Sequence, residues 1–236
     1  MPETLIKEAE TEESAVTASN GIYARYIKRP MDFILSLCAV IVLSPILLVL
    51  TVIGAIVMKG NPFFVQERPG KIDPNTGKER IFKLIKFRTM TCEKDKDGKL
   101  LPDEQRLTSY GNFLRKCSLD ELPELINILK GDMSIIGPRP LLPEYLPYYT
   151  ETERHRHDIR PGLSGLAQVN GRNAISWDQK LKYDCIYVSR ITFLGDIKLI
   201  AQTVLKTVKR SDIQVGEGFK AGKFIDQRKE KMKIRK

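Results

Sequence analysis

The sequence has few of the residues from which common metal and nucleotide sites are built. It contains four cysteines and two histidines in 236 residues, and no two cysteines have the close spacing of a zinc site. Walker-type phosphate loops, dinucleotide-binding glycine fingerprints and internal repeats are also missing. The chain therefore lacks the sequence features of zinc proteins, P-loop enzymes and Rossmann-type enzymes.

The chain also lacks a secretory signal at its start. Its first residues are acidic and polar, whereas a signal peptide begins with basic residues followed by an apolar run. We interpret residues 1–22 as a flexible acidic tail and the scattered cysteines as reduced thiols in a cytoplasmic setting. The acidic residues of this tail include Glu3, Glu8, Glu10, Glu12 and Glu13.

Positive charge exceeds negative charge, with 39 lysine and arginine residues against 29 aspartate and glutamate residues. This excess favours negatively charged partners: anionic lipid, phosphorylated small molecules or nucleic acid. The sequence contains no recognised nucleic-acid-binding motif, and we expect no nucleic-acid partner.

Residues 33–58 contain no charged side chain. A continuous helix of this length would measure about 39 Å, which exceeds the roughly 30 Å hydrocarbon core of a bilayer. Pro45 interrupts the run, because proline lacks a backbone donor and clashes with the carbonyl of Ile41. The hydroxyl of Ser44 is placed to offset the lost hydrogen bond. We therefore predict a membrane segment with a break at Ser44 and Pro45.

Two topologies fit this segment: a kinked spanning helix, or a re-entrant hairpin over residues 23–59 that enters and leaves by the same face. Basic residues flank both ends of the run, and the positive-inside tendency draws such residues to the cytoplasm. This pattern favours the hairpin. The flanking residues are Arg25, Lys28, Arg29, Lys59 and Arg68.

For the rest of the chain we predict an α+β fold that is mainly helical, with one domain over residues 60–212. Short apolar stretches and turn signals predict a β-hairpin over residues 61–88, followed by a charged surface excursion over 91–106. Apolar spacings of three and four predict a helix from near Asp120 that ends at Lys130 and Gly131.

Two further segments remain open to more than one interpretation. An apolar stripe over residues 197–208, backed by basic residues, predicts an amphipathic surface helix that packs on the core or lies on a membrane. Residues 213–236 form a basic tail that we expect to be solvated and frayed. Near anionic headgroups each basic residue would contribute about 1 kcal/mol of attraction.

Asp120 and Glu121 place adjacent carboxylates at the start of a predicted helix. They have a structural interpretation, because Ser118 and Glu121 fit a capping box and acidic residues suit the positive end of a helix dipole. They also have a chemical one, because an ionised carboxylate near Mg²⁺ and cations can attack phosphorus. Pro123 belongs in a first helical turn, which fits Asp120 as the cap better than Ser118.

Several basic residues lie in constrained loops, where little entropy is lost on binding. The planar guanidinium fork of arginine matches phosphate oxygens, so Arg139 between two prolines and Arg172 after a glycine are the leading candidates to hold a diphosphate. His155 and His157 alternate with arginines, so we assign them to the surface and not to a metal site. Trp177 is interpreted as a core residue. The basic candidates are Lys86, Arg88, Arg115, Arg139 and Arg172.

Several motifs in a fixed order, from about residue 26 to 210, resemble the bacterial sugar transferases. More narrowly, they resemble the small monotopic phosphoglycosyl transferases, and residues 170–177 resemble the PglC type of N-glycan assembly. The motifs are the break at Ser44 and Pro45 and residues 86–90, 118–123, 130–134, 137–140 and 160–172.

The resemblance implies a re-entrant helix and a covalent mechanism. Asp120 would attack the β-phosphorus of a UDP-sugar, release UMP and pass the sugar phosphate to undecaprenyl phosphate. Glu121 would assist with Mg²⁺ or with a proton, and Asp120 and Glu121 are the candidate Mg²⁺ ligands. The five basic candidates would bind phosphate or nucleotide.

The resemblance also implies a location and a biosynthetic role. The protein would be monotopic at the cytoplasmic face of a bacterial inner membrane and would initiate glycan assembly. The resemblance to the PglC type implies a role in protein glycosylation. The donor sugar would be an N-acetylated amino sugar such as diacetylated bacillosamine. Self-association is left open, and the alternative function is a non-catalytic membrane-anchored scaffold.

Overall fold

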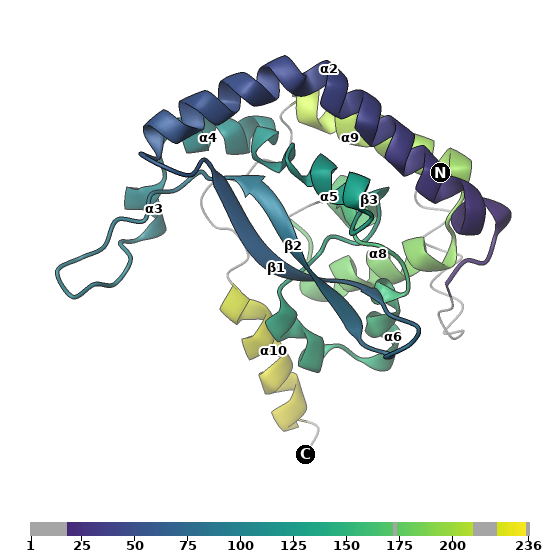
Figure 1. Cartoon of the computed structure of the whole chain (residues 1–236). Coiled ribbons are helices and arrows are strands. Elements are labelled where there is room, and N and C mark those ends of the chain that lie inside the picture. Colours follow the sequence, from purple (N-terminus) through teal and green to yellow (C-terminus); the bar gives the residue numbers. More distant parts are fainter. Residues whose placement is uncertain (1–17, 172–173, 210–220, 235–236) are drawn as a thin grey trace.

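A computed structural model describes residues 18–171, 174–209 and 221–234 (Figure 1). The long apolar segment runs along one side, and the hairpin and the shorter helices lie beneath it. The helical elements are η1 (Tyr23–Ile27), α2 (Lys28–Val57), α3 (Asp103–Arg106), α4 (Ser109–Cys117), η2 (Leu119–Glu121), α5 (Glu124–Lys130), η3 (Pro143–Tyr148), α6 (Glu151–Arg154), η4 (His155–His157), α7 (Leu166–Val169), α8 (Trp177–Ser189), α9 (Phe193–Lys209) and α10 (Ala221–Ile234). The strands are β1 (Phe63–Ile72), β2 (Glu79–Phe87), β3 (Ser134–Ile136) and β4 (Gly162–Ser164).

Helix α2 bends near its middle without ending, so that both of its ends approach the rest of the protein (Figure 1). Pro45 lies inside the helix, and the Ser44 hydroxyl donates to the carbonyl of Ile41 at 2.8 Å. The predicted compensation for the proline is therefore present, although the helix continues through the expected break. Only 11% of the most apolar stretch is buried within the protein, which distinguishes α2 from the core helix of a soluble protein.

The hairpin predicted over residues 61–88 is confirmed, since β1 and β2 pair antiparallel. Its inner face carries Phe82 and Leu84, which pack with Leu125 and Ile128 of α5 and with the inner side of α2. Asn127 fixes this arrangement, because its side chain accepts from the amide of Ile85 and donates to the carbonyl of Lys83. One core thus joins the apolar helix, the hairpin and α5.

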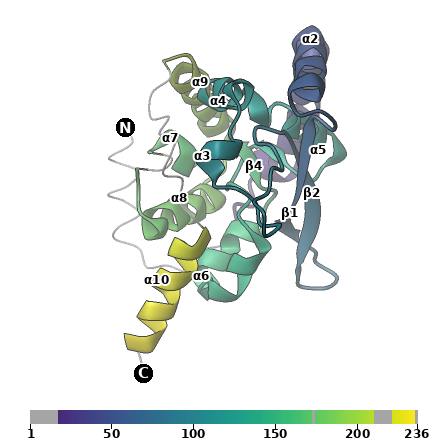
Figure 2. The same cartoon turned by 90° about the vertical axis from the view of Figure 1, so that its left-hand side faces the viewer.

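The structure contains a second pair of strands, which the sequence did not predict: β3 and β4 pair in parallel. The mainly helical α+β class is confirmed. The helix predicted over 197–208 is α9, and it packs on the core through Leu199, while Leu194, Val204 and Leu205 are exposed. In Figure 2, α2, α4 and α9 lie toward one end of the molecule and α10 toward the other.

One of the two surface assignments of the histidines is wrong. His157 is buried, with its Nδ1 atom 3.2 Å from the carbonyl of Gly70 and its ring against Tyr149. Burial, with the positive charge of Arg156, lowers the pKa of His157 to about 3. His155 lies at the surface as predicted, with a side chain that is 38% exposed and an Nδ1 atom 2.7 Å from Asp158. Tertiary packing of η4 against the hairpin turn, which local charge alternation does not reveal, accounts for the error.

The C-terminal expectation also needs correction for the described residues 221–234. They form α10, and Phe224 is fully buried against Tyr145 and Trp177. Arg228 pairs with Glu153 and with Asp178. This part of the chain is therefore a docked helix. Trp177 is a core residue, as predicted.

Candidate active site

The two carboxylates Asp120 and Glu121 lie in η2, the short 3₁₀ turn that connects α4 to α5. Ser118 ends α4 in the left-handed conformation with φ 54°, which turns the chain directly before the dyad. The leucines on either side of the dyad, Leu119 and Leu122, pack into a cluster with Leu47 and Leu50 of α2. The dyad is thereby held against the C-terminal half of the apolar helix.

The capping box considered for the dyad is not present. Ser118 makes no side-chain capping hydrogen bond to η2, and α5 begins only at Glu124, with Pro123 as its N-cap. Proline needs no backbone donor there, so the chain breaks into two short helices instead of the single one predicted. The structural interpretation of Glu121 as a capping residue is therefore wrong.

Glu121 is bound by two of the predicted basic residues. Its Oε1 atom lies 2.9 Å from Lys86 Nζ and 2.5 Å from a terminal nitrogen of Arg139. Burial would raise the pKa of Glu121, but the charges of Arg139 and Lys86 outweigh it, so this pKa lies well below its usual value. Lys86 arrives from the end of β2, and Arg139 from the segment that follows β3.

Asp120 differs from its neighbour. Within the described part of the chain, its carboxylate forms no hydrogen bond or ion pair. Burial and the negative charge of Glu121 raise the pKa of Asp120, against the opposing effects of Lys86, Arg139 and Arg115. Two adjacent carboxylates thus have different environments: Glu121 is neutralised by cations, and Asp120 is partly exposed and more basic than usual.

A third carboxylate, Glu124, was not among the predicted site residues. Its Oε1 atom lies 3.0 Å from Lys86 Nζ, so Lys86 lies between Glu124 and Glu121. The Glu124 side chain is only 3% exposed, and burial, outweighing the attraction of Lys86, raises its pKa to about 7. In the single helix predicted from near Asp120, Glu124 would lie on the same side as Asp120, and this spacing was the available signal in the sequence.

Arg115 approaches the site from α4. Its Nε atom donates to the hydroxyl of Thr89 at 3.1 Å, beyond the end of β2. This contact depends on Gly111, where an added Cβ atom would lie 2.0 Å from the carbonyl oxygen of Thr89. Helix α4 therefore rests directly on the backbone that follows Lys86.

The remaining predicted residues are not brought into this cluster by observed contacts. Among the residues that the structure describes, Arg88 forms no ion pair with the dyad, although its amide donates to the carbonyl of Pro62 at 2.7 Å. Arg172 lies outside the described residues. The structure therefore assembles Lys86, Arg139 and Glu121 beside Asp120, with Arg115 nearby.

Two further cations near Arg139 were missed from the sequence. Burial, with repulsion from Arg139, lowers the pKa of Arg68 to about 10 and that of Lys180 to about 8. Arg68 donates to the carbonyl of Pro140 at 3.3 Å, and Lys180 lies 5.0 Å from the ring centre of Trp177. Such mutual repulsion between cations is relieved by an anionic ligand, which fits a phosphorylated substrate.

The carboxylates of the site could contribute to binding a metal ion. No group of three or more histidine, cysteine, aspartate or glutamate residues with the arrangement of a metal site is found over residues 18–171, 174–209 and 221–234. Mg²⁺, however, is commonly held by one or two carboxylates together with substrate phosphates and water. Asp120 and Glu121 fit such a shared ion, and they do not form a complete protein cage.

The chain is similar to known proteins over most of its length. The family model described as bacterial sugar transferase matches residues 23–210. The uncharacterized sugar transferase EpsL of Bacillus subtilis is 48% identical over 192 residues, which cover 81% of this chain and 90% of that protein.

Two other relatives carry more specific names. The undecaprenyl-phosphate galactose phosphotransferase of Salmonella typhimurium is 34% identical over 80% of this chain. The UDP-N-acetylgalactosamine-undecaprenyl-phosphate N-acetylgalactosaminephosphotransferase of Aeromonas hydrophila is 34% identical over 78% of this chain. The chain spans only 42% and 44% of the length of these two relatives.

Proposed function

Because the chain belongs to the bacterial sugar transferase family and is a phosphoglycosyl transferase, we propose that it moves a sugar-1-phosphate from a UDP-sugar to undecaprenyl phosphate through a covalent intermediate on Asp120. The observation that carries this proposal is the contrast within the dyad. Glu121 is bound by Lys86 and Arg139. The Asp120 carboxylate has a raised pKa and is partly exposed, and the leucines on either side of the dyad pack on α2.

The covalent step requires no reactant other than the UDP-sugar. A carboxylate oxygen of ionised Asp120 forms a bond to the β-phosphorus, the bond from that phosphorus to the bridging oxygen breaks, and UMP leaves with the electron pair. In the second step a phosphate oxygen of undecaprenyl phosphate attacks the same phosphorus and releases the carboxylate. A covalent intermediate lets one site receive a water-soluble and a lipid substrate in turn.

The basic residues and a metal ion have complementary roles in this proposal. Lys86, Arg139 and Arg115 would neutralise and orient the diphosphate oxygens, with Arg88 and Arg172 as further phosphate or nucleotide contacts. Asp120 and Glu121 would hold Mg²⁺ together with those oxygens. When bound, Mg²⁺ would offset the negative charge of the transferring phosphoryl group.

We also propose a monotopic, re-entrant topology for residues 23–59 at the cytoplasmic face of a bacterial inner membrane. The bend in α2 and the basic residues that flank it in the sequence, Lys28 and Lys59, support it. A cysteine introduced before Tyr23, in a chain whose native cysteines are replaced, should react with a membrane-impermeant reagent only from the cytoplasmic side. Labelling from the opposite side would show a spanning helix.

The donor sugar is proposed from the named relatives and from the PglC resemblance. The names of the relatives point to galactose or N-acetylgalactosamine. The PglC resemblance points to an N-acetylated amino sugar such as diacetylated bacillosamine. A screen of UDP-sugars with undecaprenyl phosphate, with and without Mg²⁺, would identify the substrate and test the metal. The product would enter glycoconjugate biosynthesis, including protein glycosylation.

Intact mass spectrometry tests the mechanism. Incubation of the purified protein with its UDP-sugar should add the mass of a sugar phosphate, and Asp120→Asn should remove this adduct and UMP release together. Glu124→Asp is the matched control, because it keeps a carboxylate in the cluster outside the dyad. An adduct of normal amount in Asp120→Asn would exclude Asp120 as the nucleophile, and absence of UMP release from every UDP-sugar would favour the scaffold alternative.

A further inference from the structure

A pocket of about 310 Å³ lies between the turn of the hairpin and the C-terminal end of α5. Its walls combine cations with apolar side chains, of which Ile72 and Pro74 are the more accessible and Phe82 belongs mainly to the core. Charged lining residues of the pocket are Lys71, Asp73, Arg80, Asp132 and Arg160.

Two arginines from distant parts of the chain converge beside this pocket. Arg29, from the first turn of α2, donates to the carbonyls of Ile128 and Leu129 at 2.6 and 3.0 Å. Arg160 donates to the carbonyl of Gly131 at 2.8 Å. These contacts satisfy carbonyls at the end of α5, and they hold both guanidinium groups in place without cancelling their full charge.

The other two cations of the pocket face solvent. The Arg80 side chain is 74% exposed and lies 3.9 Å from Asp132, which is too long for a strong ion pair, and Lys71 is exposed. Burial, with repulsion from Arg29 and Arg80, lowers the pKa of Arg160. Positive charge therefore remains in excess here despite Asp73 and Asp132.

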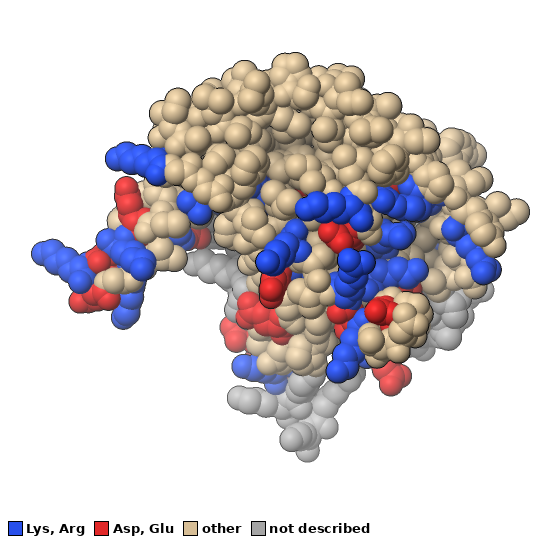
Figure 3. All heavy atoms as spheres, in the orientation of Figure 1, with Lys and Arg blue, Asp and Glu red and all other residues tan. Residues whose placement is uncertain are grey.

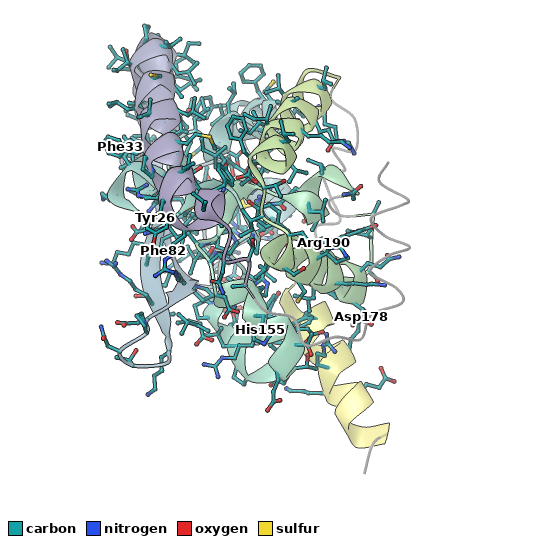
Figure 4. All side chains as sticks on the ribbon, turned by 90° about the vertical axis from the view of Figure 1, so that its right-hand side faces the viewer. Tyr26, Phe33, Phe82, His155, Asp178 and Arg190 are labelled. Carbon is teal, nitrogen blue, oxygen red and sulfur yellow. The ribbon has the colours of Figure 1, made fainter. Side chains whose placement is uncertain are left out.

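One edge of the pocket lies beside the first turn of α2, because a Cβ atom added at Gly131 would lie 3.3 Å from a terminal nitrogen of Arg29. The guanidinium carbon of Arg29 is 5.7 Å from the ring centre of Phe33, an exposed residue on the apolar part of α2. Long basic side chains at such a boundary keep their charge at the headgroups. Figure 3 shows basic side chains gathered directly beneath the apolar surface of α2, and Figure 4 shows Phe33 on the same side of the molecule as Phe82.

This pocket is separate from the candidate active site. Helix α5 has seven residues, which corresponds to about 10 Å of length. Glu124 of the carboxylate cluster is at its first residue, and the pocket begins at Gly131, just past its last residue.

We propose that this pocket binds the phosphodiester headgroup of an anionic membrane phospholipid, with Arg80, Arg160 and Lys71 as the phosphate contacts. Guanidinium groups hold phosphate oxygens through charge-assisted hydrogen bonds, and Ile72 and Pro74 supply an apolar edge for the glycerol end of the lipid. A lipid held between the hairpin, α5 and α2 would fix the depth and rotation of the protein at the membrane surface.

Native mass spectrometry of the full chain in a neutral detergent tests this proposal. The protein is titrated separately with dioctanoyl phosphatidylglycerol and dioctanoyl phosphatidylcholine. We expect a clear preference for phosphatidylglycerol. Each positive charge near a headgroup contributes about five-fold in affinity, so Lys71→Gln/Arg80→Gln should weaken phosphatidylglycerol binding about 25-fold and leave phosphatidylcholine binding unchanged.

The matched control is Lys96→Gln/Lys99→Gln, which removes the same charge from exposed residues of the loop between β2 and α3. It should bind phosphatidylglycerol like the parent protein, and circular dichroism should show the same helix content in all three. Equal affinity for the two lipids, or an equal loss in the control, would overturn the proposal. A loss of farnesyl phosphate binding without a loss of phosphatidylglycerol binding would assign the pocket to the isoprenyl carrier instead.

Discussion

The ammonium group of Lys28 lies 2.6 Å from the carboxylate of Asp196, and both side chains are buried. This ion pair joins the first turn of α2 to the first turn of α9. Asp196 also accepts hydrogen bonds from the hydroxyls of Tyr23 and Tyr187, at 2.8 and 2.7 Å. The position of the apolar helix on the rest of the protein is therefore fixed by polar contacts as well as by packing.

Removal of one partner of this pair should destabilise the protein strongly. Asp196→Ala leaves the Lys28 charge buried without its nearest counter-ion, which should cost about 3–5 kcal/mol in unfolding free energy. Thermal or denaturant unfolding in one detergent measures this cost. The double variant Lys28→Met/Asp196→Leu should be more stable than Asp196→Ala alone, and a single variant within 0.5 kcal/mol of the parent protein would contradict a structural role.

The hydroxyl of Ser44 should stabilise the bend in α2. Ser44→Ala leaves the Ile41 carbonyl without its donor in an apolar environment, which should cost about 1 kcal/mol. Ser44→Thr keeps a hydroxyl at the same position and is the matched control. The melting temperatures of the parent protein and the two variants, measured in the same detergent, test this prediction. An equal decrease in melting temperature for Ser44→Thr and Ser44→Ala would contradict it.

Gly111 should be required for α4 to rest on the segment after β2. Gly111→Ala would place a Cβ atom 2.0 Å from the Thr89 carbonyl oxygen, so α4 would have to move and carry Arg115 and the dyad with it. We expect a loss of stability of about 1–3 kcal/mol and a larger loss of UMP release. Lys116→Ala, an exposed change in the same helix, is the control and should leave both measurements nearly unchanged.

The raised pKa of Glu124 predicts a dependence of stability on pH. Its value of about 7 lies above the ordinary 4.5, so the folded protein binds this proton more tightly than the unfolded chain does. The resulting stabilisation is complete below pH 4.5 and is lost as the pH rises through 7. The difference in unfolding free energy between the parent protein and Glu124→Gln should therefore change between pH 4.5 and 7, in favour of the variant at higher pH. A constant difference over that range would contradict the raised pKa.

The sequence correctly predicted the elements that depend on local pattern. The hairpin over 61–88, the end of α5 at Gly131 and the helix over 197–208 follow from turn residues and apolar periodicity. It failed where distant segments meet. The burial of His157 depends on Gly70 of β1, 87 residues away, and that of Phe224 on Tyr145 and Trp177.

The candidate site shows the same division. Asp120, Glu121, Lys86 and Arg139 were identified from residue type and motif, because phosphoryl chemistry needs carboxylates and fixed cations. Glu124 was missed because a buried carboxylate and a solvated one have the same local sequence signal.

By itself, the sequence determined an uncharged apolar segment with a bend at Pro45, a mainly helical α+β fold and a dyad among basic loops, since hydrophobic length, proline geometry and residue chemistry act locally. Only the tertiary structure decided that Lys86 lies between Glu121 and Glu124 and that Lys28 binds Asp196. Contacts of this kind join residues far apart in the chain, and their energies depend on burial, which no local pattern contains.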